Sequence, residues 1–338
     1  EETAPKATDP EDLFMGGAED PLAMYFDGEP NADGSEDFEP EAGELEKAEP
    51  AAGSMSDEDY EAFMKYDDLS QRLAATKSNI IKLKRMKINF NDLKFQNKII
   101  RKKIYKNFEK IFNHSKFIFG PEIKVLEKKL NFFCNTKYCI TTSSGTDALL
   151  ISLMALNLKS TDEVITTPFT YIATAEVILR VGARPVFADI NPATGNIDPV
   201  SIKNKINKKT KAIIAVSLFG QTANIEAIKK IAKNIIIIED ASQSFGATHN
   251  NKKSCSLADI GCTSFFPSKI LGCYGDGGAI FTNNKKLSER FIKIRKHGQG
   301  SKYNYEILGI NARLDTMQAA VLLEKIKLLN LEIKKRNN

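Results

Sequence analysis

At 338 residues with a 42% hydrophobic content, the chain is long enough for one large domain with an added segment, or for two domains. Residues 1–70 hold 23 acidic residues against 3 lysines, whereas the rest carries 45 basic residues against 20 acidic ones, so the net charge of +5 describes neither part. No apolar run reaches the roughly 18 residues of a membrane helix, and the cysteines and histidines show no metal-ligand spacing. Without a signal-peptide pattern, we expect a cytoplasmic protein that binds neither membrane nor metal.

The basic body favours an anionic partner, such as a phosphorylated substrate. Its richness in Lys, Asn and Ile is also typical of AT-rich coding sequence, so a charge without functional meaning is the alternative. The lysines are scattered along expected helices and are not interleaved with exposed aromatic residues, so we do not expect nucleic-acid binding.

The first 80 residues differ in kind from the rest of the chain, because they are rich in Glu, Asp, Ala, Pro and Gly and contain isoleucine only at Ile80. Such a segment cannot bury enough apolar surface to offset its chain entropy, so we expect disorder. Acidic residues mixed with aromatic ones also occur in interaction segments, but a solvated tail or a foreign fusion is the favoured interpretation. We therefore predict an acidic tail over residues 1–85 and a functional domain over residues 86–338, beginning at Met86.

From Met86 onward, helical patterning over residues 91–113 and 121–132 precedes short apolar runs that alternate with helical stretches. This alternation predicts an α/β fold with a mostly parallel sheet covered by helices on both faces. In such sheets the chemistry gathers at the carboxyl ends of the strands. The expected strands are Tyr138–Thr142, Glu163–Thr166, Arg184–Asp189, Ala212–Leu218 and Ile235–Glu239; the expected helices are 146–157, 171–181, 199–206, 224–233 and, last, Asp315–Arg336.

The segment Thr141–Asp147 lies between an expected strand and an expected helix and contains small hydroxyl residues around Gly145. Free N–H groups at a helix start, together with the helix dipole, can bind a phosphate group. An ordinary N-cap, with Ser144 or Thr146 as the capping residue, explains the same pattern and is favoured when the segment is taken alone.

Asp240 closes a fully apolar strand, which places its carboxylate at the functional edge of the sheet. A carboxylate in such a place is costly without a cationic partner. The protonated ring nitrogen of a ligand would be one such partner, and a lysine or an N-cap role would be the structural alternative.

Lys269 ends the segment Thr263–Lys269 and is followed by the glycine-rich stretch Gly272–Ala279. Apolar and aromatic neighbours would hold a lysine amine partly neutral, as a Schiff-base lysine requires. The glycines let the backbone pass close to a bulky ligand. In so basic a chain, a solvated side chain is the default interpretation for a single lysine. Lys269 is singled out only because the segment Thr141–Asp147 and the strand that ends at Asp240 precede it in the chain.

Together these segments resemble the DegT/StrS family of sugar aminotransferases that depend on pyridoxal 5′-phosphate (PLP). The resemblance runs from about Met86 to Asn338 and implies the PLP-dependent transferase fold type I, with PLP as the cofactor. It also implies a small C-terminal domain, which we expect to be missing because the chain stops in or just after the last helix. The motifs that carry the resemblance are Phe119–Glu122, Ser144–Leu149, Pro168–Thr174, Glu239–Gln243 and Phe266–Lys269.

Carried onto this chain, the resemblance assigns roles to the site residues. Lys269 would hold the cofactor as an internal aldimine and shuttle the proton, and Asp240 would pair with the pyridinium nitrogen. Gln243 would contact the phenolic oxygen of the ring, and Tyr171 would stack on the ring. The phosphate would be held by Gly145, Thr146 and Ser264.

The resemblance also implies partners. Asn311 would reach the phosphate of a partner subunit, which implies a homodimer. The stretch Thr263–Phe281, read with residues 217–221 and 295–299, looks closest to a branch that aminates C3 of a UDP-2-acetamido-2-deoxy-hexuluronate, with L-glutamate as donor, in O-antigen synthesis. His297 and Arg313 are the candidates for the substrate side, and a cation at a helix C-terminus before Gly298 is the alternative for His297.

The sequence thus predicts a nucleotide-sugar aminotransferase that works in two half-reactions. A non-catalytic fragment or interaction protein that lacks the substrate domain is the alternative from another class, and amination at C4 of a 4-keto-sugar is a further one. Dehydratases of the family carry histidine at the position of Lys269, so the lysine favours transamination.

Overall fold

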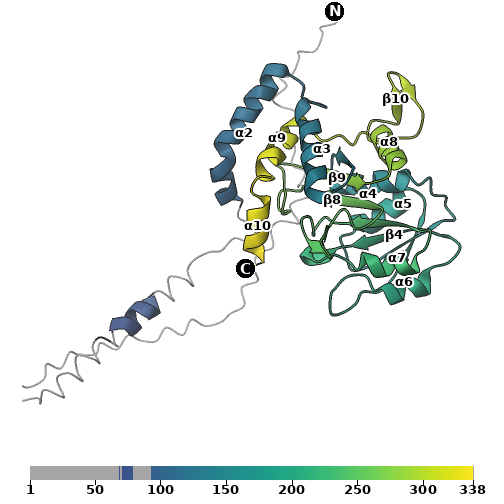
Figure 1. Ribbon diagram of the computed structural model, residues 1–338, viewed down its shortest axis with the longest axis horizontal. Coiled ribbons are helices and arrows are strands. Elements are labelled where there is room, and N and C mark those ends of the chain that lie inside the picture. The colour runs from purple at the N-terminus through teal and green to yellow at the C-terminus, as the bar shows by residue number, and fades with distance from the viewer. Residues whose placement is uncertain (1–67, 69–70, 79–92, 338) are drawn as a thin grey trace, which may run out of the picture. The chain divides into compact units, whose positions relative to one another are not determined.

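The structure is a computed structural model that describes residues 68, 71–78 and 93–337 (Figure 1). The chain divides into two units, Glu1–Lys87 and Ile88–Asn338. In the first unit a short helical stretch over residues 71–78 is described, and the predicted acidic tail lies almost entirely outside the described residues. The boundary predicted at residues 85 and 86 stays a prediction. The second unit contains the central sheet, its helices and the candidate site.

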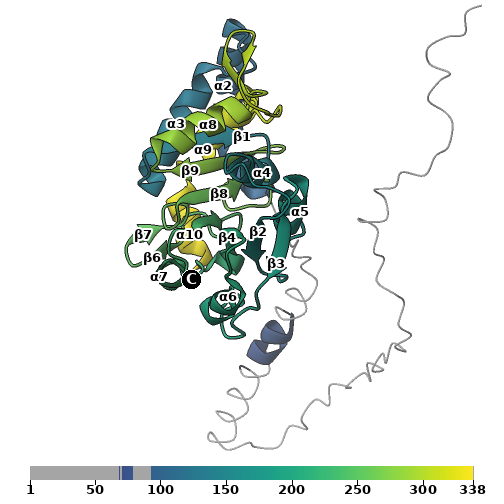
Figure 2. The ribbon, with the colours of Figure 1, turned by 90° about the vertical axis from the view of Figure 1, so that its right-hand side faces the viewer.

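The second unit is built on a seven-stranded sheet with the order β1-β9-β8-β5-β4-β2-β3. From β8 through β5, β4 and β2 to β3 all neighbours are parallel, whereas β9 runs antiparallel to both β8 and β1. Figure 2 shows the successive strands across the sheet. The strands are β1 (Tyr138–Thr142), β2 (Glu163–Thr166), β3 (Arg184–Phe187), β4 (Thr210–Val216), β5 (Ile236–Asp240), β8 (Ile260–Ser264) and β9 (Gly278–Thr282).

The central strands are apolar on both sides because helices cover both faces of the sheet. Ile214 and Ile238 pack on the face covered by α4, α5 and α8, whereas Ile213 and Ile237 pack on the opposite face, beneath α6 and α7. The β1–β9 end of that opposite face is covered by α3, α9 and α10. The helices are α3 (Pro121–Cys134), α4 (Gly145–Met154), α5 (Ala173–Arg180), α6 (Pro199–Lys205), α7 (Ile225–Ile231), α8 (Lys285–Ile294), α9 (Thr316–Lys325) and α10 (Leu329–Arg336).

The long helix α2 (Lys94–His114) forms an outer layer beside α9 (Figure 1). Its Ile100 and Ile104 are buried in one cluster with Val321 of α9. No helix of the described residues is long and apolar enough to cross a membrane. Within the same residues, no group of three His, Cys, Asp or Glu side chains is placed to hold a metal ion.

The α/β architecture and the mostly parallel sheet confirm the predicted fold class. Several element boundaries differ from the prediction, among them the end of β3 at Phe187 rather than Asp189 and the end of α4 at Met154 rather than residue 157. The strand expected over Ala212–Leu218 ends at Val216, because Ser217 turns its hydroxyl to a buried carboxylate and Phe219 takes a left-handed conformation with φ 54°. The last helix, expected to be continuous over Asp315–Arg336, is α9 and α10, separated by a break at residues 326–328. There the N–H groups of residues 327 and 328 donate to carbonyls three positions earlier, which interrupts the α-helical ladder.

Several elements were not predicted. Strand β8 ends and strand β9 begins in the stretch Thr263–Ala279, which the sequence presented only as a lysine and glycine motif, and helix α8 was also not predicted. Two short hairpins were also missed: β6 (Thr248–His249) with β7 (Lys252–Lys253), and β10 (Gln299–Ser301) with β11 (Asn304–Tyr305). The second hairpin stands away from the sheet (Figure 1).

Candidate active site

A cavity of about 450 Å³ lies at the carboxyl ends of the parallel strands. Seven of the ten predicted site residues line it and come from four separate segments of the chain. The fold therefore brings together motifs that are far apart in the sequence, as expected for a sheet whose strand ends share one edge. The seven residues are Gly145, Thr146, Tyr171, Asp240, Gln243, Ser264 and Lys269.

Asp240 lies at the end of β5 and is 6% exposed. Its Oδ2 accepts a hydrogen bond from the hydroxyl of Thr174 at 3.1 Å, and its Oδ1 accepts from Ser242, from the N–H at 3.1 Å and from the hydroxyl at 2.7 Å. None of the Lys, Arg or His residues that the structure describes forms an ion pair with this carboxylate. A buried carboxylate held only by neutral donors is suited to a cationic ligand group.

The start of α4 forms one wall of the cavity. Ser144 is the N-cap, because its hydroxyl accepts from the N–H of Asp147 at 3.0 Å. The N–H groups of Gly145 and Thr146, at the first two helical positions, have no partner available within the helix. The N-cap and the phosphate-binding interpretations are thus compatible, since the cap leaves both N–H groups for an anion at the positive end of the dipole.

Gly278 makes close packing at this helix start possible. A Cβ atom at this position would lie 2.3 Å from the carbonyl oxygen of Ser144, and one at Gly145 would lie 2.6 Å from the Cβ of Ser264. These contacts bring β9, β8 and the start of α4 together around the expected phosphate position.

We predict that Gly278→Ala weakens PLP binding by about tenfold or more and lowers the melting temperature, because the added methyl group must displace the N-cap backbone of α4. Titration of the apo chain with PLP, followed by absorbance, measures the affinity. Gly275→Ala is the matched control, since its Cβ would meet only the far end of the Gln318 side chain, at 3.1 Å. Equal affinities for the two variants would contradict the prediction.

Lys269 lies in the loop between β8 and β9, residues 265–277, and its side chain is half-buried. The base of the loop is closed by Phe265, which donates its N–H to Gly277 at 2.7 Å and accepts at its carbonyl from the N–H of Cys273 at 2.8 Å. At the turn itself, Lys269 donates its N–H to the carbonyl of Phe266 at 2.9 Å. The lysine is therefore presented by a closed loop at the same edge of the sheet as Asp240.

Gln243 and Tyr171 lie at the rim of the cavity and are exposed, Tyr171 by 74%. The Oε1 of Gln243 accepts a hydrogen bond from the N–H of Phe219 at 3.0 Å. Phe219 and Phe266, also at this rim or beside it, are 73% and 51% exposed. Aromatic surface left open around a polar cavity is suited to stacking on a planar ligand ring or on a second protein surface.

Glu239 precedes Asp240 and points to the other side of the strand, where it is fully buried. Its Oε1 accepts from the hydroxyls of Ser217 at 2.9 Å and Ser254 at 2.8 Å, and its Oε2 accepts from the N–H of Cys255 at 2.8 Å. Burial raises the pKa of Glu239 above its usual value, and these three hydrogen bonds counteract part of that rise.

The three remaining predicted residues do not line the cavity. His297 is exposed, adopts φ 62°, and lies just after α8, where its N–H donates to Ile310 at 3.0 Å. Arg313 is half-buried. Asn311 is exposed and pairs with Lys296 in an isolated bridge, next to Ala312, whose carbonyl accepts from the N–H of Ser143 at 3.2 Å. The structure thus places the backbone beside Asn311 near the start of α4, where the phosphate is expected.

Sequence reasoning assigned no role to three further residues of the cavity: Thr174, Ser242 and Asp276. For Ser242 a signal was present, because a serine two positions after an aspartate often donates back to its carboxylate. Thr174 lies 66 positions from Asp240 and on another crossover unit, so no local pattern connects the two.

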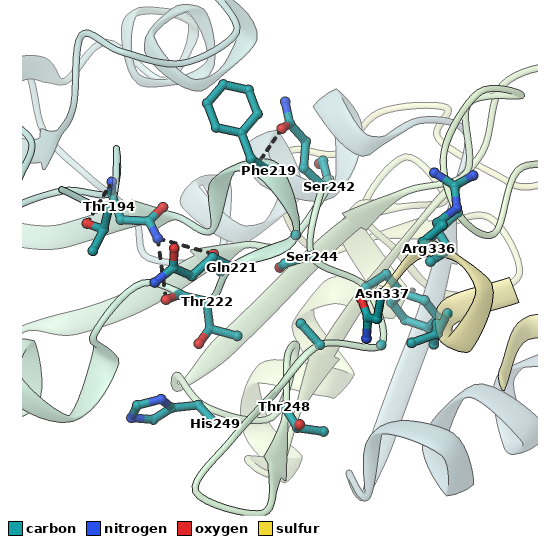
Figure 3. A pocket seen from close by; sticks show the side chains of 18 of the residues that line it. Thr194, Phe219, Gln221, Thr222, Ser242, Ser244, Thr248, His249, Arg336 and Asn337 are labelled. Atoms are coloured by element: carbon teal, nitrogen blue, oxygen red, sulfur yellow. Dashed lines mark hydrogen bonds between the residues drawn. The ribbon is translucent and has the colours of Figure 1, made fainter. Parts of the chain in front are cut away.

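A second, wider cavity of about 1360 Å³ adjoins the first and shares Ser242, Gln243, Ser268 and Lys269 with it. Figure 3 shows Phe219, Gln221 and Thr222 on one side of this cavity and Arg336 and Asn337 of the chain end on another. Its wall combines polar and apolar side chains in similar measure, so it can take a large ligand group that extends from the first cavity.

All five cysteines are free thiols and buried. Burial raises the pKa of the Cys273 thiol to about 11. Burial likewise raises the pKa values of Cys139, Cys255 and Cys262. These thiols therefore stay protonated near neutral pH and act as packing groups rather than nucleophiles.

Comparison with known proteins identifies the family. Residues 98–338 match the model of the DegT/DnrJ/EryC1/StrS aminotransferase family. The chain belongs to this family. It is 50% identical over 248 residues to a UDP-2-acetamido-2-deoxy-3-oxo-D-glucuronate aminotransferase of Pseudomonas aeruginosa, which covers 73% of this chain and 69% of that protein. It is 40% identical over 225 residues to a UDP-N-acetyl-3-dehydro-alpha-D-glucosamine 3-aminotransferase of Acidithiobacillus ferrooxidans, covering 66% of this chain and 61% of that protein.

Solved structures of this aminotransferase family have the same fold. A DegT/DnrJ/EryC1/StrS aminotransferase from Brucella abortus superposes with a TM-score of 0.71 at 39% identity, covering 74% of this chain and 70% of that one. The protein ntda from Bacillus subtilis, solved with bound cofactor PMP, superposes with a TM-score of 0.68 at 36% identity, covering 73% of this chain and 58% of that one. The fold is thus that of the type I PLP-dependent transferases, as predicted.

PLP is the cofactor of the family, and the residues of the 450 Å³ cavity fit it. The buried carboxylate of Asp240 has the charge to meet a protonated ring nitrogen, and the free N–H groups at the start of α4 suit a phosphate. Lys269 supplies an amine at the same cavity, and the exposed ring of Tyr171 offers a stacking surface.

Proposed function

We propose that this aminotransferase transfers the amino group of L-glutamate to the 3-keto group of a UDP-2-acetamido-2-deoxy-hexuluronate, for polysaccharide synthesis such as that of O-antigen. The observation that carries the substrate class is the 50% identity to the P. aeruginosa relative, whose name specifies a 3-oxo-glucuronate linked to UDP. The complete set of cavity residues around Lys269 supports amine transfer.

When bound, PLP supplies an electron sink that stabilises negative charge on the carbon bearing the transferred amine. In this proposal Asp240 binds the protonated ring nitrogen and keeps it charged, and Gln243 binds the ring oxygen. Lys269 would be the attachment point of the cofactor and the group that moves the proton at the reacting carbon. The phosphate is held by Ser264 and by the N–H groups of Gly145 and Thr146, and Tyr171 stacks on the ring.

The wider cavity offers room for the nucleotide sugar, since it opens directly from Gln243 and Lys269. A substrate with a diphosphate and a carboxylate also suits a body in which basic residues outnumber acidic ones. His297 and Arg313 stay part of the proposal as substrate-side residues that would act across an interface, because both lie outside the two cavities.

A homodimer is part of the proposal. Exposed aromatic side chains surround the cavity, among them Phe169 at 47% and Tyr171 at 74%, and a partner subunit would cover them. Asn311 would reach the partner's cofactor phosphate from the loop beside the hairpin β10–β11. The five free thiols are typical of a reducing compartment and support a cytoplasmic location.

Amine transfer is tested in two half-reactions on the purified chain. With PLP added, we expect a visible absorbance band that glutamate bleaches, and a UDP-3-keto-hexuluronate should restore the band. Steady-state rates should give parallel lines in a double-reciprocal plot, as for ping-pong kinetics. Restoration by a UDP-4-keto-sugar alone would move the proposal to C4, and loss of a sugar hydroxyl without amine transfer would indicate dehydration.

A non-catalytic fragment is the outcome if the band forms but glutamate does not bleach it. The chain spans 69% of the P. aeruginosa relative and 65% of another relative, a pleiotropic regulatory protein of Geobacillus stearothermophilus. A version extended at the C-terminus by the remaining part of the P. aeruginosa relative is the control that separates loss of substrate binding from loss of chemistry.

A further inference from the structure

The loop that follows β4, residues 217–223, is closed behind the cofactor cavity by one buried hydroxyl. Ser217 donates this hydroxyl to Oε1 of Glu239 at 2.9 Å and accepts with the same oxygen from the N–H of Ala223 at 3.0 Å. Ser217 and Glu239 are both fully buried. The two ends of the loop therefore meet at a single side chain whose orientation is set by Glu239.

A second buried side chain, Asn196, holds the middle of the same loop. Its Oδ1 accepts from the N–H of Leu218 at 2.9 Å, and its Nδ2 donates to the carbonyls of Gln221 at 3.2 Å and Thr222 at 3.4 Å. Figure 3 shows Gln221 and Thr222 with these bonds as dashed lines. Asn196 is 4% exposed, so water does not compete for its hydrogen bonds to the loop.

The hydrogen bonds of Ser217 and those of Asn196, called the two braces below, hold the loop on both sides of Phe219. Phe219 has φ 54° and ψ 30°. A residue with a Cβ atom adopts this left-handed conformation only where its surroundings enforce it. The conformation directs the N–H of Phe219 to Oε1 of Gln243, at 3.0 Å (Figure 3). A backbone N–H can donate to the oxygen of a side-chain amide but not to its NH₂ group. This contact therefore fixes the orientation of the Gln243 amide, with Oε1 toward Phe219.

We propose that Ser217, Glu239 and Asn196 are positioning residues that fix the loop so that Phe219 holds the oxygen of Gln243 and leaves its Nε2 as a hydrogen-bond donor to the cofactor. The inference rests on the proposed role of Gln243 at the ring oxygen. Without the braces, Phe219 would leave its left-handed conformation, and the Gln243 amide could turn its oxygen toward the equally electron-rich ring oxygen.

Glu239 offers a matched pair of substitutions. It accepts from the buried hydroxyls of Ser217 at 2.9 Å and Ser254 at 2.8 Å, on the same carboxylate oxygen. Ser217→Ala frees the loop, whereas Ser254→Ala removes an equivalent bond from the same carboxylate and leaves the loop contacts in place. Asp240, Lys269 and Asp276, the charged side chains that line the cavity, are unchanged in both.

The readout is the pH midpoint at which the visible absorbance of the PLP-loaded chain changes. A donor to the ring oxygen stabilises its ionised form and lowers this midpoint. We expect Gln243→Leu and Ser217→Ala each to raise the midpoint by about 0.5 to 1 pH unit, and Ser254→Ala to leave it where it is. The double variant Gln243→Leu/Ser217→Ala should titrate like Gln243→Leu alone, because both changes remove one and the same contact.

The inference is overturned if Gln243→Leu raises the midpoint while Ser217→Ala does not, or if Ser254→Ala raises it as much as Ser217→Ala does. Asn196→Ala repeats the test through the other brace, should Ser217→Ala not fold. If the wild-type chain shows no visible band with PLP, or if Gln243→Leu leaves the midpoint unchanged, the failure lies in the proposed function of the site itself.

Discussion

Lys269→Ala is expected to lower the rate of amine transfer by at least about 10³-fold, because it removes both the attachment point of the cofactor and the group that moves the proton. The side chain lies on a loop that is closed by backbone hydrogen bonds at Phe265, so its removal should leave the fold intact. The single-turnover rate of glutamate bleaching measures the loss.

Mass spectrometry after borohydride reduction gives a second measure. In the wild-type chain the cofactor mass should remain on the peptide that contains Lys269, and in Lys269→Ala it should be lost. Lys285→Ala is the control, since this side chain is 75% exposed at the start of α8, and it should behave as the wild type. A Lys269→Ala variant that keeps the cofactor through reduction would place the attachment at another lysine.

Asp240→Asn should lower turnover by about 10² to 10⁴-fold, which corresponds to the loss of 3–5 kcal/mol when one partner of a buried charge pair is removed. The substitution separates charge from hydrogen bonding. An asparagine oxygen can still accept from Ser242, and its amide can donate to Thr174, whose hydroxyl then donates to Thr170 at 3.2 Å.

For this reason Asp240→Asn should fold with nearly the stability of the wild type, and the loss should appear in PLP affinity and in the rate. Circular dichroism and a PLP titration separate the two quantities. Asp189→Asn, at an exposed aspartate after β3, is the isosteric control. Unchanged turnover in Asp240→Asn would mean that the ring nitrogen needs no anionic partner in this protein.

The sequence predicted those parts of the fold that local patterns encode. β1 and β2 begin and end where their apolar runs do, and Pro199 marks the start of α6. β8 and β9 were missed because each is a five-residue run with a glycine in it, and both depend on pairing with distant strands. The break between α9 and α10 carries no proline or glycine, so the sequence offered no signal for it.

At the site, the cavity residues were found through the ordered motifs, whereas the contacts that support them were not. Glu239 was noted only as a member of a motif, yet it is buried behind Asp240 and holds the loop that ends at Ala223. Side-chain partners such as Thr174 for Asp240 join separate crossover units, and only the folded sheet brings them together.

The antiparallel strand β9 has a consequence for how the protein folds. β9 pairs with β1, residue Thr142 opposite Gly278, and every other strand of the sheet lies between these two in the chain. Contacts of such high sequence separation form late, because the entropy of closing a long loop must be overcome first. The start of α4, which we propose binds the phosphate, packs against Gly278 of this same pairing, so a chain that has acquired only its parallel strands is not expected to hold PLP. We therefore expect PLP to bind only after β9 has paired with β1. Bound PLP then stabilises the fully folded state and not the partly folded ones.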